Sequence, residues 1–169
     1  YMGLGLYKIA IGFVPGKYQW LLSIIGFEGN LKEGKQYLKT SYEKGKFTSV
    51  ESRVYLSFFS IKEREEQSFE AVNIMQQLVK EYPQSPVFRL FLASLYQQMS
   101  RMDESIELTN EALELNTNSL QNEMKKGAYS LLGTAYFRKN NFYEAIRNFE
   151  EHLKYVHNDD RYNVSLFLL

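Results

Sequence analysis

The sequence predicts an all-α protein built from pairs of antiparallel helices, and three observations support this prediction. Only three prolines occur, and Pro15, Pro83 and Pro86 stand where helices should begin or end. Apolar residues recur at intervals of three and four positions, whereas the Val, Ile and Thr alternation of strands is rare. A small residue also recurs, since Ala71 and Ser105 are 34 positions apart. This period is typical of stacked helix pairs.

The chain begins with two predicted helices, at residues 3–13 and 16–26, which Val14-Pro15 separates. In the second helix, the spacing of the apolar residues predicts an inward face. That face consists of Trp20, Leu21, Ile24 and Ile25.

A third helix is expected at residues 31–43, with Asn30 as its N-cap and Gly45 at its end. The pattern of the whole chain predicts about ten helices. We expect helix pairs at about 16–44, 48–82, 85–115 and 122–156, followed by the start of a further helix at 160–169. We interpret residues 1–169 as a single repeat domain. Because its last residues lack the polar face of a terminal cap, we expect a fragment of a longer chain.

One motif identifies the type of repeat. Its residues are Leu132, Gly133, Tyr136, Ala145 and Phe149, and the same frame recurs as Leu92, Ala93, Tyr96 and Ser105. Across the chain it places a small residue where two helices cross, at Gly34, Ala71, Ser105 and Ala145. This pattern resembles the tetratricopeptide repeat. The resemblance implies a tetratricopeptide-like α-α superhelix, a right-handed solenoid.

A narrower resemblance lies near the N-terminus. The stretch Gly26-Phe27-Glu28-Gly29-Asn30 with Gly34, together with the glycine-rich opening Gly3-Leu4-Gly5, is similar to the tetratricopeptide repeat protein 39 family. That family includes the fungal inclusion-body clearance proteins. The similarity covers roughly residues 1–115. It implies a scaffold or adaptor without established catalytic residues.

Composition excludes several function classes. Hydrophobic residues make up 44% of the chain and aromatic residues 15%, which favours an ordered protein. Lys and Arg number 20, as do Asp and Glu, so no basic excess indicates a nucleic-acid partner. Cysteine is absent, which excludes thiolate metal sites and cysteine nucleophiles. No uncharged run is long enough to span a membrane.

Candidates for catalysis or for a cofactor are few. His152 and His157 are five positions apart, so on one helix they diverge instead of sharing a metal ion. The Gly3-Leu4-Gly5 stretch lacks a preceding strand and the other residues of a phosphate-binding loop. We therefore predict no catalytic residue, no metal and no cofactor.

The concave surface of the repeats is the predicted site of function. Repeat position nine, which projects onto this surface, is held by Ser23, Ser60, Ser94 and Thr134. Small residues there can simply tighten the curvature of the array, or they can form the floor of a peptide-binding groove. The predicted groove consists of these four residues with Arg53, Leu90, Gln97, Phe137 and Arg138.

These observations predict a non-enzymatic scaffold that binds an unidentified peptide or protein. The alternative is a structural or self-associating segment, because the two ends, Tyr1–Phe13 and Val164–Leu169, are apolar. A hydrolase or transferase has the least support. The groove lacks the two-lysine, two-asparagine cluster that chaperone-binding repeats use, so a C-terminal chaperone tail is not expected as the ligand. No signal peptide is visible, and both a cytoplasmic and a periplasmic location remain open.

Overall fold

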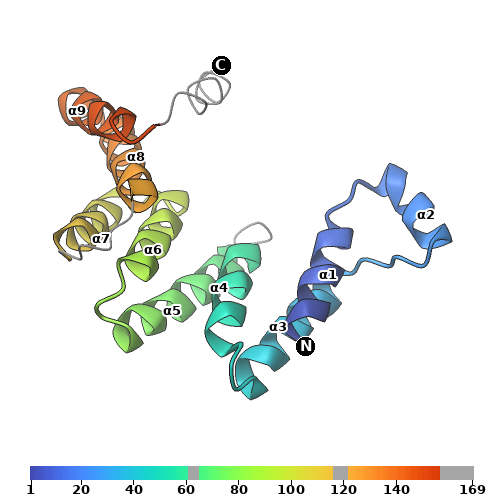
Figure 1. Ribbon diagram of the computed structural model, residues 1–169. Coiled ribbons are helices and arrows are strands. Elements are labelled where there is room, and N and C mark those ends of the chain that lie inside the picture. The colour runs from blue at the N-terminus through green and yellow to red at the C-terminus, as the bar shows by residue number, and fades with distance from the viewer. Residues whose placement is uncertain (61–64, 116–121, 157–169) are drawn as a thin grey trace. The chain divides into compact units, whose positions relative to one another are not determined.

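The computed structural model describes residues 1–60, 65–115 and 122–156, without the side chains of residues 60 and 65–68. Within these ranges the chain forms nine α-helices and no strand, so the all-α prediction is confirmed (Figure 1). The further helix expected at 160–169 lies outside the described residues. The helices are α1 (Met2–Gly12), α2 (Gly16–Ile24), α3 (Leu31–Lys44), α4 (Ser49–Ser60), α5 (Glu65–Glu81), α6 (Pro86–Gln98), α7 (Met102–Glu114), α8 (Asn122–Arg138) and α9 (Phe142–Leu153).

The chain divides into two compact units, Tyr1–Met75 and Gln76–Leu169, whose boundary falls within α5. In the first unit the buried apolar side chains include Ile9, Leu38, Leu56, Ala71 and Met75. The second unit buries Leu78, Leu92, Ala93, Ala112, Ala128, Leu132, Ala135 and Ala145. That the whole chain forms a single repeat domain remains a prediction.

In the first unit, α3 packs against α1. The two helices meet at glycines, since a Cβ atom on Gly34 would lie 2.5 Å from Ile9 Cγ1 and 2.8 Å from the Gly5 carbonyl oxygen. The backbone N–H of Asn30 donates to the Lys8 carbonyl at 3.0 Å, and the Lys8 ammonium pairs with the Glu33 carboxylate at 3.1 Å. The predicted pairing of α2 with α3 over residues 16–44 is therefore wrong, because α1 is the partner of α3.

Helix α2 lies in an insertion between α1 and α3, which we call the α2 insertion (residues 13–29). The backbones of Gly12 and Gly29 meet at its base, where a Cβ atom on Gly29 would lie 2.2 Å from the Gly12 nitrogen. Figure 1 shows α2 standing away from α1 and α3. No residue of α2 is buried. The inward face predicted for Trp20, Leu21, Ile24 and Ile25 is therefore wrong, and all four side chains are more than half exposed.

The ends of α3 follow the sequence prediction. The Asn30 side chain caps the N-terminus by accepting a hydrogen bond from the Glu33 backbone N–H at 3.0 Å. At the other end Gly45 donates its backbone N–H to the Ser41 carbonyl. Contact with α4 is stabilised by a 2.8 Å hydrogen bond between the Ser41 and Thr48 hydroxyls. The predicted N-cap and C-terminal glycine are confirmed.

In the second unit, α6 packs against α7 and α8 against α9, and α7 also contacts α8. The small residues of the motif lie at these crossings, because Ser105 is fully buried and a Cβ atom on Gly133 would lie 2.6 Å from the Phe149 ring. In both pairs a short turn connects the helices. One residue of each turn has the left-handed backbone conformation, with φ of 59°. It is Ser100 between α6 and α7 and Asn140 between α8 and α9. The repeat motif of the sequence therefore describes this unit well.

Candidate functional site

Of the three groove residues predicted in the first unit, the structure describes the side chains of Ser23 and Arg53, which differ in position and exposure. Ser23 lies on the α2 insertion and donates its hydroxyl to the Trp20 carbonyl at 2.7 Å. Arg53 is only 6% exposed on α4, where its guanidinium carbon lies 5.5 Å from the centre of the Tyr42 ring. The side chain of Ser60 lies outside the described residues. Neither Ser23 nor Arg53 thus has the position that we expected for a groove residue.

In the second unit the predicted residues lie on two helices that contact each other, α6 and α8. Leu90, Ser94 and Gln97 are spaced by four and three positions, so they share one side of α6. Thr134, Phe137 and Arg138 share one side of α8 by the same rule. We call these six residues the α6–α8 face.

Two hydrogen bonds connect the helices of the α6–α8 face. The buried Gln97 side chain donates from Nε2 to the Leu131 carbonyl at 2.6 Å. The Arg138 guanidinium donates from Nη1 to the Gln97 backbone carbonyl at 3.0 Å. Gln97 is therefore a structural connection between α6 and α8, since its amide donor already has a partner within the protein.

The remaining residues of the α6–α8 face are accessible. Phe137 is 57% exposed and packs its ring edge-on against Phe142, with 5.8 Å between the ring centres. Ser94 and Thr134 are half-buried, and Leu90 is similarly accessible. Arg138 is exposed and uses one of its five N–H donors in the bond to Gln97. The face thus presents an aromatic ring, two hydroxyls and a cation.

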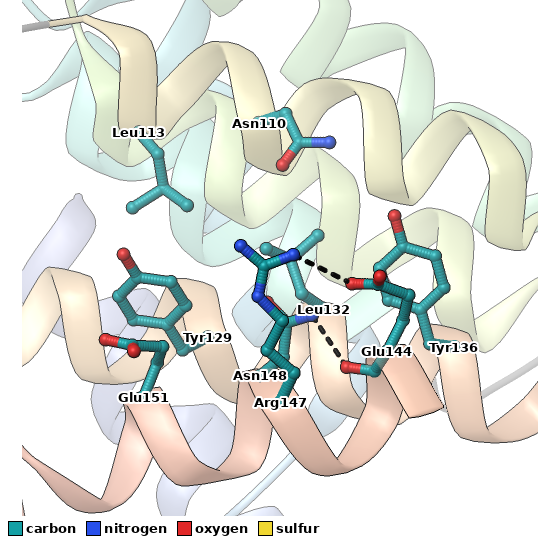
Figure 2. Close-up of a pocket in the computed structure, with 9 residues that line it drawn as sticks. All are labelled: Asn110, Leu113, Tyr129, Leu132, Tyr136, Glu144, Arg147, Asn148 and Glu151. Carbon is teal, nitrogen blue, oxygen red and sulfur yellow. Dashed lines mark hydrogen bonds and ion pairs between the residues drawn. The ribbon is translucent and has the colours of Figure 1, made fainter. Parts of the chain in front are cut away.

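A pocket that we did not predict from the sequence lies among α7, α8 and α9 (Figure 2). Its volume is ≈ 330 Å³, near the lower end of the range for small-ligand sites. Figure 2 shows the Arg147 guanidinium over its centre, with Tyr129 at one end and Tyr136 at the other. The lining residues are Asn110, Leu113, Tyr129, Leu132, Tyr136, Glu144, Arg147, Asn148 and Glu151.

The charged groups of the pocket are paired along α9 and its C-cap residue, Lys154. Arg147 Nη1 lies 3.7 Å from Glu144 Oε2, and Glu151 pairs with Lys154 at 2.5 Å. Burial raises the pKa of the Tyr129 phenol above its ordinary value, with smaller contributions from Tyr155 and Glu151. A phenol with a raised pKa keeps its proton at neutral pH. The pocket therefore offers the protonated Tyr129 hydroxyl as a donor beside paired charges, which suits hydrogen bonding to a polar group.

The sequence contains a signal for this pocket. Tyr129, Leu132 and Tyr136 recur at intervals of three and four positions, which places them on one side of α8. The same spacing is typical of core residues, so it does not by itself distinguish a pocket from a packed core. The half-buried state of both rings follows from the packing of α7 and α9 on α8.

Comparison with protein families identifies the chain. The family model described as Iml2/Tetratricopeptide repeat protein 39 matches residues 1–157. The chain belongs to this family. The match confirms the predicted resemblance and extends it well beyond residue 115, through the α8–α9 pair. No curated protein matches the chain closely enough to count as a relative.

Two solved structures of another protein, MamA, are similar to this chain in fold. One, titled "MamA MSR-1 C2", is 17% identical, with a TM-score of 0.57 over 83% of this chain and 72% of that chain. The other, a point mutant of MamA, is 16% identical, with a TM-score of 0.52 over 91% of this chain and 98% of that chain. At this identity the likeness shows the fold alone. It confirms a tetratricopeptide-like α-α solenoid.

Two further features concern ligands and membranes. Across residues 1–60, 65–115 and 122–156, no three His, Asp or Glu side chains come together as a metal site requires. His152, on α9, instead places Nδ1 2.8 Å from the Lys126 carbonyl oxygen. In the described part of the chain, every helix is too short or too polar to cross a bilayer.

Proposed function

We propose that the protein is a non-enzymatic scaffold that binds a peptide or protein partner on the α6–α8 face. The observation that supports this most directly is the pair of hydrogen bonds from Gln97 to Leu131 and from Arg138 to Gln97. These bonds hold α6 and α8 together, which are the first helices of two neighbouring helix pairs. They do not use the side chains of Phe137, Ser94 or Thr134. A rigid surface loses little entropy when a partner binds, so it suits recognition. Membership of a tetratricopeptide repeat family is consistent with this role.

The chemistry of the face suggests the kind of partner. Phe137 offers an apolar ring, and the remaining Arg138 donors can pair with a carboxylate. Ser94 and Thr134 provide hydroxyls for the backbone of a bound segment. We therefore propose a segment with an apolar side chain next to an acidic one. In this proposal Ser23, Ser60 and Arg53 make no contact with the segment.

A test should leave Gln97 intact, because its substitution would separate α6 from α8. We choose Phe137→Glu, which changes an exposed ring and places a carboxylate beside Arg138. The matched control is Phe47→Glu, at a ring that is 85% exposed between α3 and α4. Affinity capture from the native host should recover a partner with the wild-type chain and with Phe47→Glu, but not with Phe137→Glu. Equal recovery by all three chains would exclude the α6–α8 face as the site.

Self-association through the apolar ends is a second candidate. Ile9 is fully buried by the packing of α1 on α3, whereas Tyr1, Leu4 and Phe13 stay exposed. Val164–Leu169, at the other end, lie outside the described residues. Light scattering over a range of protein concentrations distinguishes the candidates. A mass that rises with concentration favours self-association, and a constant monomer mass favours the scaffold.

A further inference from the structure

The α2 insertion exposes an unusual amount of apolar surface. Five large side chains on this short segment are each more than half exposed, and Trp20 and Ile24 reach 62% and 69%. The five are Tyr18, Trp20, Leu21, Ile24 and Ile25. Contiguous apolar surface of this kind marks a site of interaction with a protein or a membrane. A helix of only nine residues also has little stability without a partner for its apolar side chains.

Two polar side chains of the insertion make hydrogen bonds within it, and its lysine makes a cation–π contact. Gln19 Nε2 donates to the Val14 carbonyl at 2.9 Å, and the Ser23 hydroxyl donates to the Trp20 carbonyl at 2.7 Å. The Lys17 ammonium lies over the Tyr18 ring, 4.9 Å from its centre. These groups therefore have local partners when water is withdrawn, which a segment entering an apolar medium requires.

The distribution of side chains around α2 favours a lipid surface over a protein groove. At 100° per residue, the apolar side chains from Trp20 to Leu22 cover about 200° of the helix, wider than the stripe that a packed helix usually presents. Trp and Tyr are enriched where a bilayer meets water. Helix α2 carries one charged residue, Lys17, whereas Glu28, the one acidic residue of the insertion, lies outside the helix next to Gly29 at its base. Such a segment complements an anionic membrane.

We propose that the α2 insertion binds the interface of an anionic lipid membrane, with α2 lying in the plane of the surface. The backbone contact between Gly12 and Gly29 keeps the two ends of the insertion together, so α2 can enter the headgroup region while α1 stays packed on α3. The helix anchors the chain from one side and does not span the bilayer. This proposal is independent of the α6–α8 face, which lies in the other unit.

The test uses the fluorescence of Trp20, the single tryptophan of the chain. The purified chain is mixed with phosphatidylcholine–phosphatidylserine vesicles, some of which carry brominated acyl chains. We expect the emission to shift to shorter wavelength and the brominated lipids to quench it. Pure phosphatidylcholine vesicles should bind roughly five-fold more weakly, since one lysine interacts with the anionic surface. An unchanged emission spectrum with both kinds of vesicle would overturn the proposal.

Two glutamate substitutions at exposed isoleucines provide the comparison. Ile24→Glu should weaken vesicle binding about ten-fold or more, because it removes a large apolar group from the inserted surface. Ile146→Glu, at a side chain that is 60% exposed on α9, should leave binding unchanged. Equal losses in the two variants would show that α2 is not the anchor. An emission shift that appears without vesicles as the protein is concentrated would show that a second copy covers α2, which also overturns the proposal.

Discussion

The α1–α3 pair and the α8–α9 pair both bring two helices together at a glycine, but the contacts and the connections differ. At the first crossing Gly34 faces the backbone of Gly5, whereas at the second Gly133 faces the Phe149 ring. The α2 insertion connects the first pair, and a short turn with Asn140 in the left-handed region connects the second. A helix pair is thus defined by the close contact and not by nearness in the sequence.

The largest effect is expected from adding a methyl group at the two crossings. Gly34→Ala should lower the free energy of unfolding by about 2 kcal/mol, because the new Cβ atom would meet the Gly5 carbonyl oxygen and α1 must shift. Gly133→Ala should cost only about 1 kcal/mol, since the Phe149 ring can rotate away. Urea unfolding followed by circular dichroism measures both losses.

A glycine with open surroundings serves as the control for these substitutions. A Cβ atom on Gly127, in α8, would meet nothing within 4 Å. Gly127→Ala should therefore raise the free energy of unfolding by about 1 kcal/mol through helix propensity alone. If Gly34→Ala stabilised the protein as Gly127→Ala does, close packing of α1 on α3 would be excluded.

The N-caps of α3 and α9 provide the next test. Asn30 Oδ1 accepts from the Glu33 N–H at 3.0 Å, and Asn141 Oδ1 accepts from the Glu144 N–H at 3.3 Å. Replacing either asparagine by alanine should cost about 1 kcal/mol, with the greater loss at Asn30, whose bond is shorter. Asn73→Ala, at an exposed position inside α5, is the control and should cost nothing. A greater loss at Asn141 than at Asn30 would contradict the ranking from bond length.

Much of the fold could be predicted from the sequence because it depends on local signals. Prolines, the Asn30 cap and apolar spacing predicted the nine helices of the described residues close to their observed bounds, and the small residues predicted the crossings. The pairing of α3 depended on a contact between residues far apart in the sequence. The repeat frame assigned the nearest upstream helix, α2, although Gly5 and Gly34 make α1 the partner.

The candidate site was less predictable for a similar reason. Periodicity shows that α2 has an apolar side but not whether another helix covers it, so Trp20 was placed inward. Position counting assigned Gln97 to the predicted groove, yet only the structure shows its bond to the Leu131 carbonyl. Tyr129 and Tyr136 have the spacing of core residues, and the pocket between them depends on how far α7 and α9 lie apart.

The short turns of the second unit predict effects no larger than those of the N-caps and of opposite sign. Ser100 has a φ of 59°, a conformation that strains most residues and that glycine adopts freely. Ser100→Gly should raise the free energy of unfolding by about 1 kcal/mol, and Asn140→Gly by about half as much, because asparagine tolerates this region. Ser94→Gly, inside α6, should instead destabilise the protein. Thermal unfolding distinguishes the gains from the loss, and a Ser100→Gly variant that melts lower than wild type would contradict the turn geometry.

The smallest change in stability is expected when α2 is removed. Replacing residues 14–26 by a short Gly-Ser linker preserves the Gly12–Gly29 contact and the rings of Phe13 and Phe27. Shortening a loop by half changes the closure free energy by only about 0.6 kcal/mol, so the remaining helices should unfold at nearly the same urea concentration. Deleting α1 instead should destabilise the first unit strongly, because it removes the fully buried Ile9 and uncovers the face of α3 that packs on α1. If the α2 deletion proved as damaging as the α1 deletion, α2 would be part of the packed core and the comparison between the two helix pairs would fail.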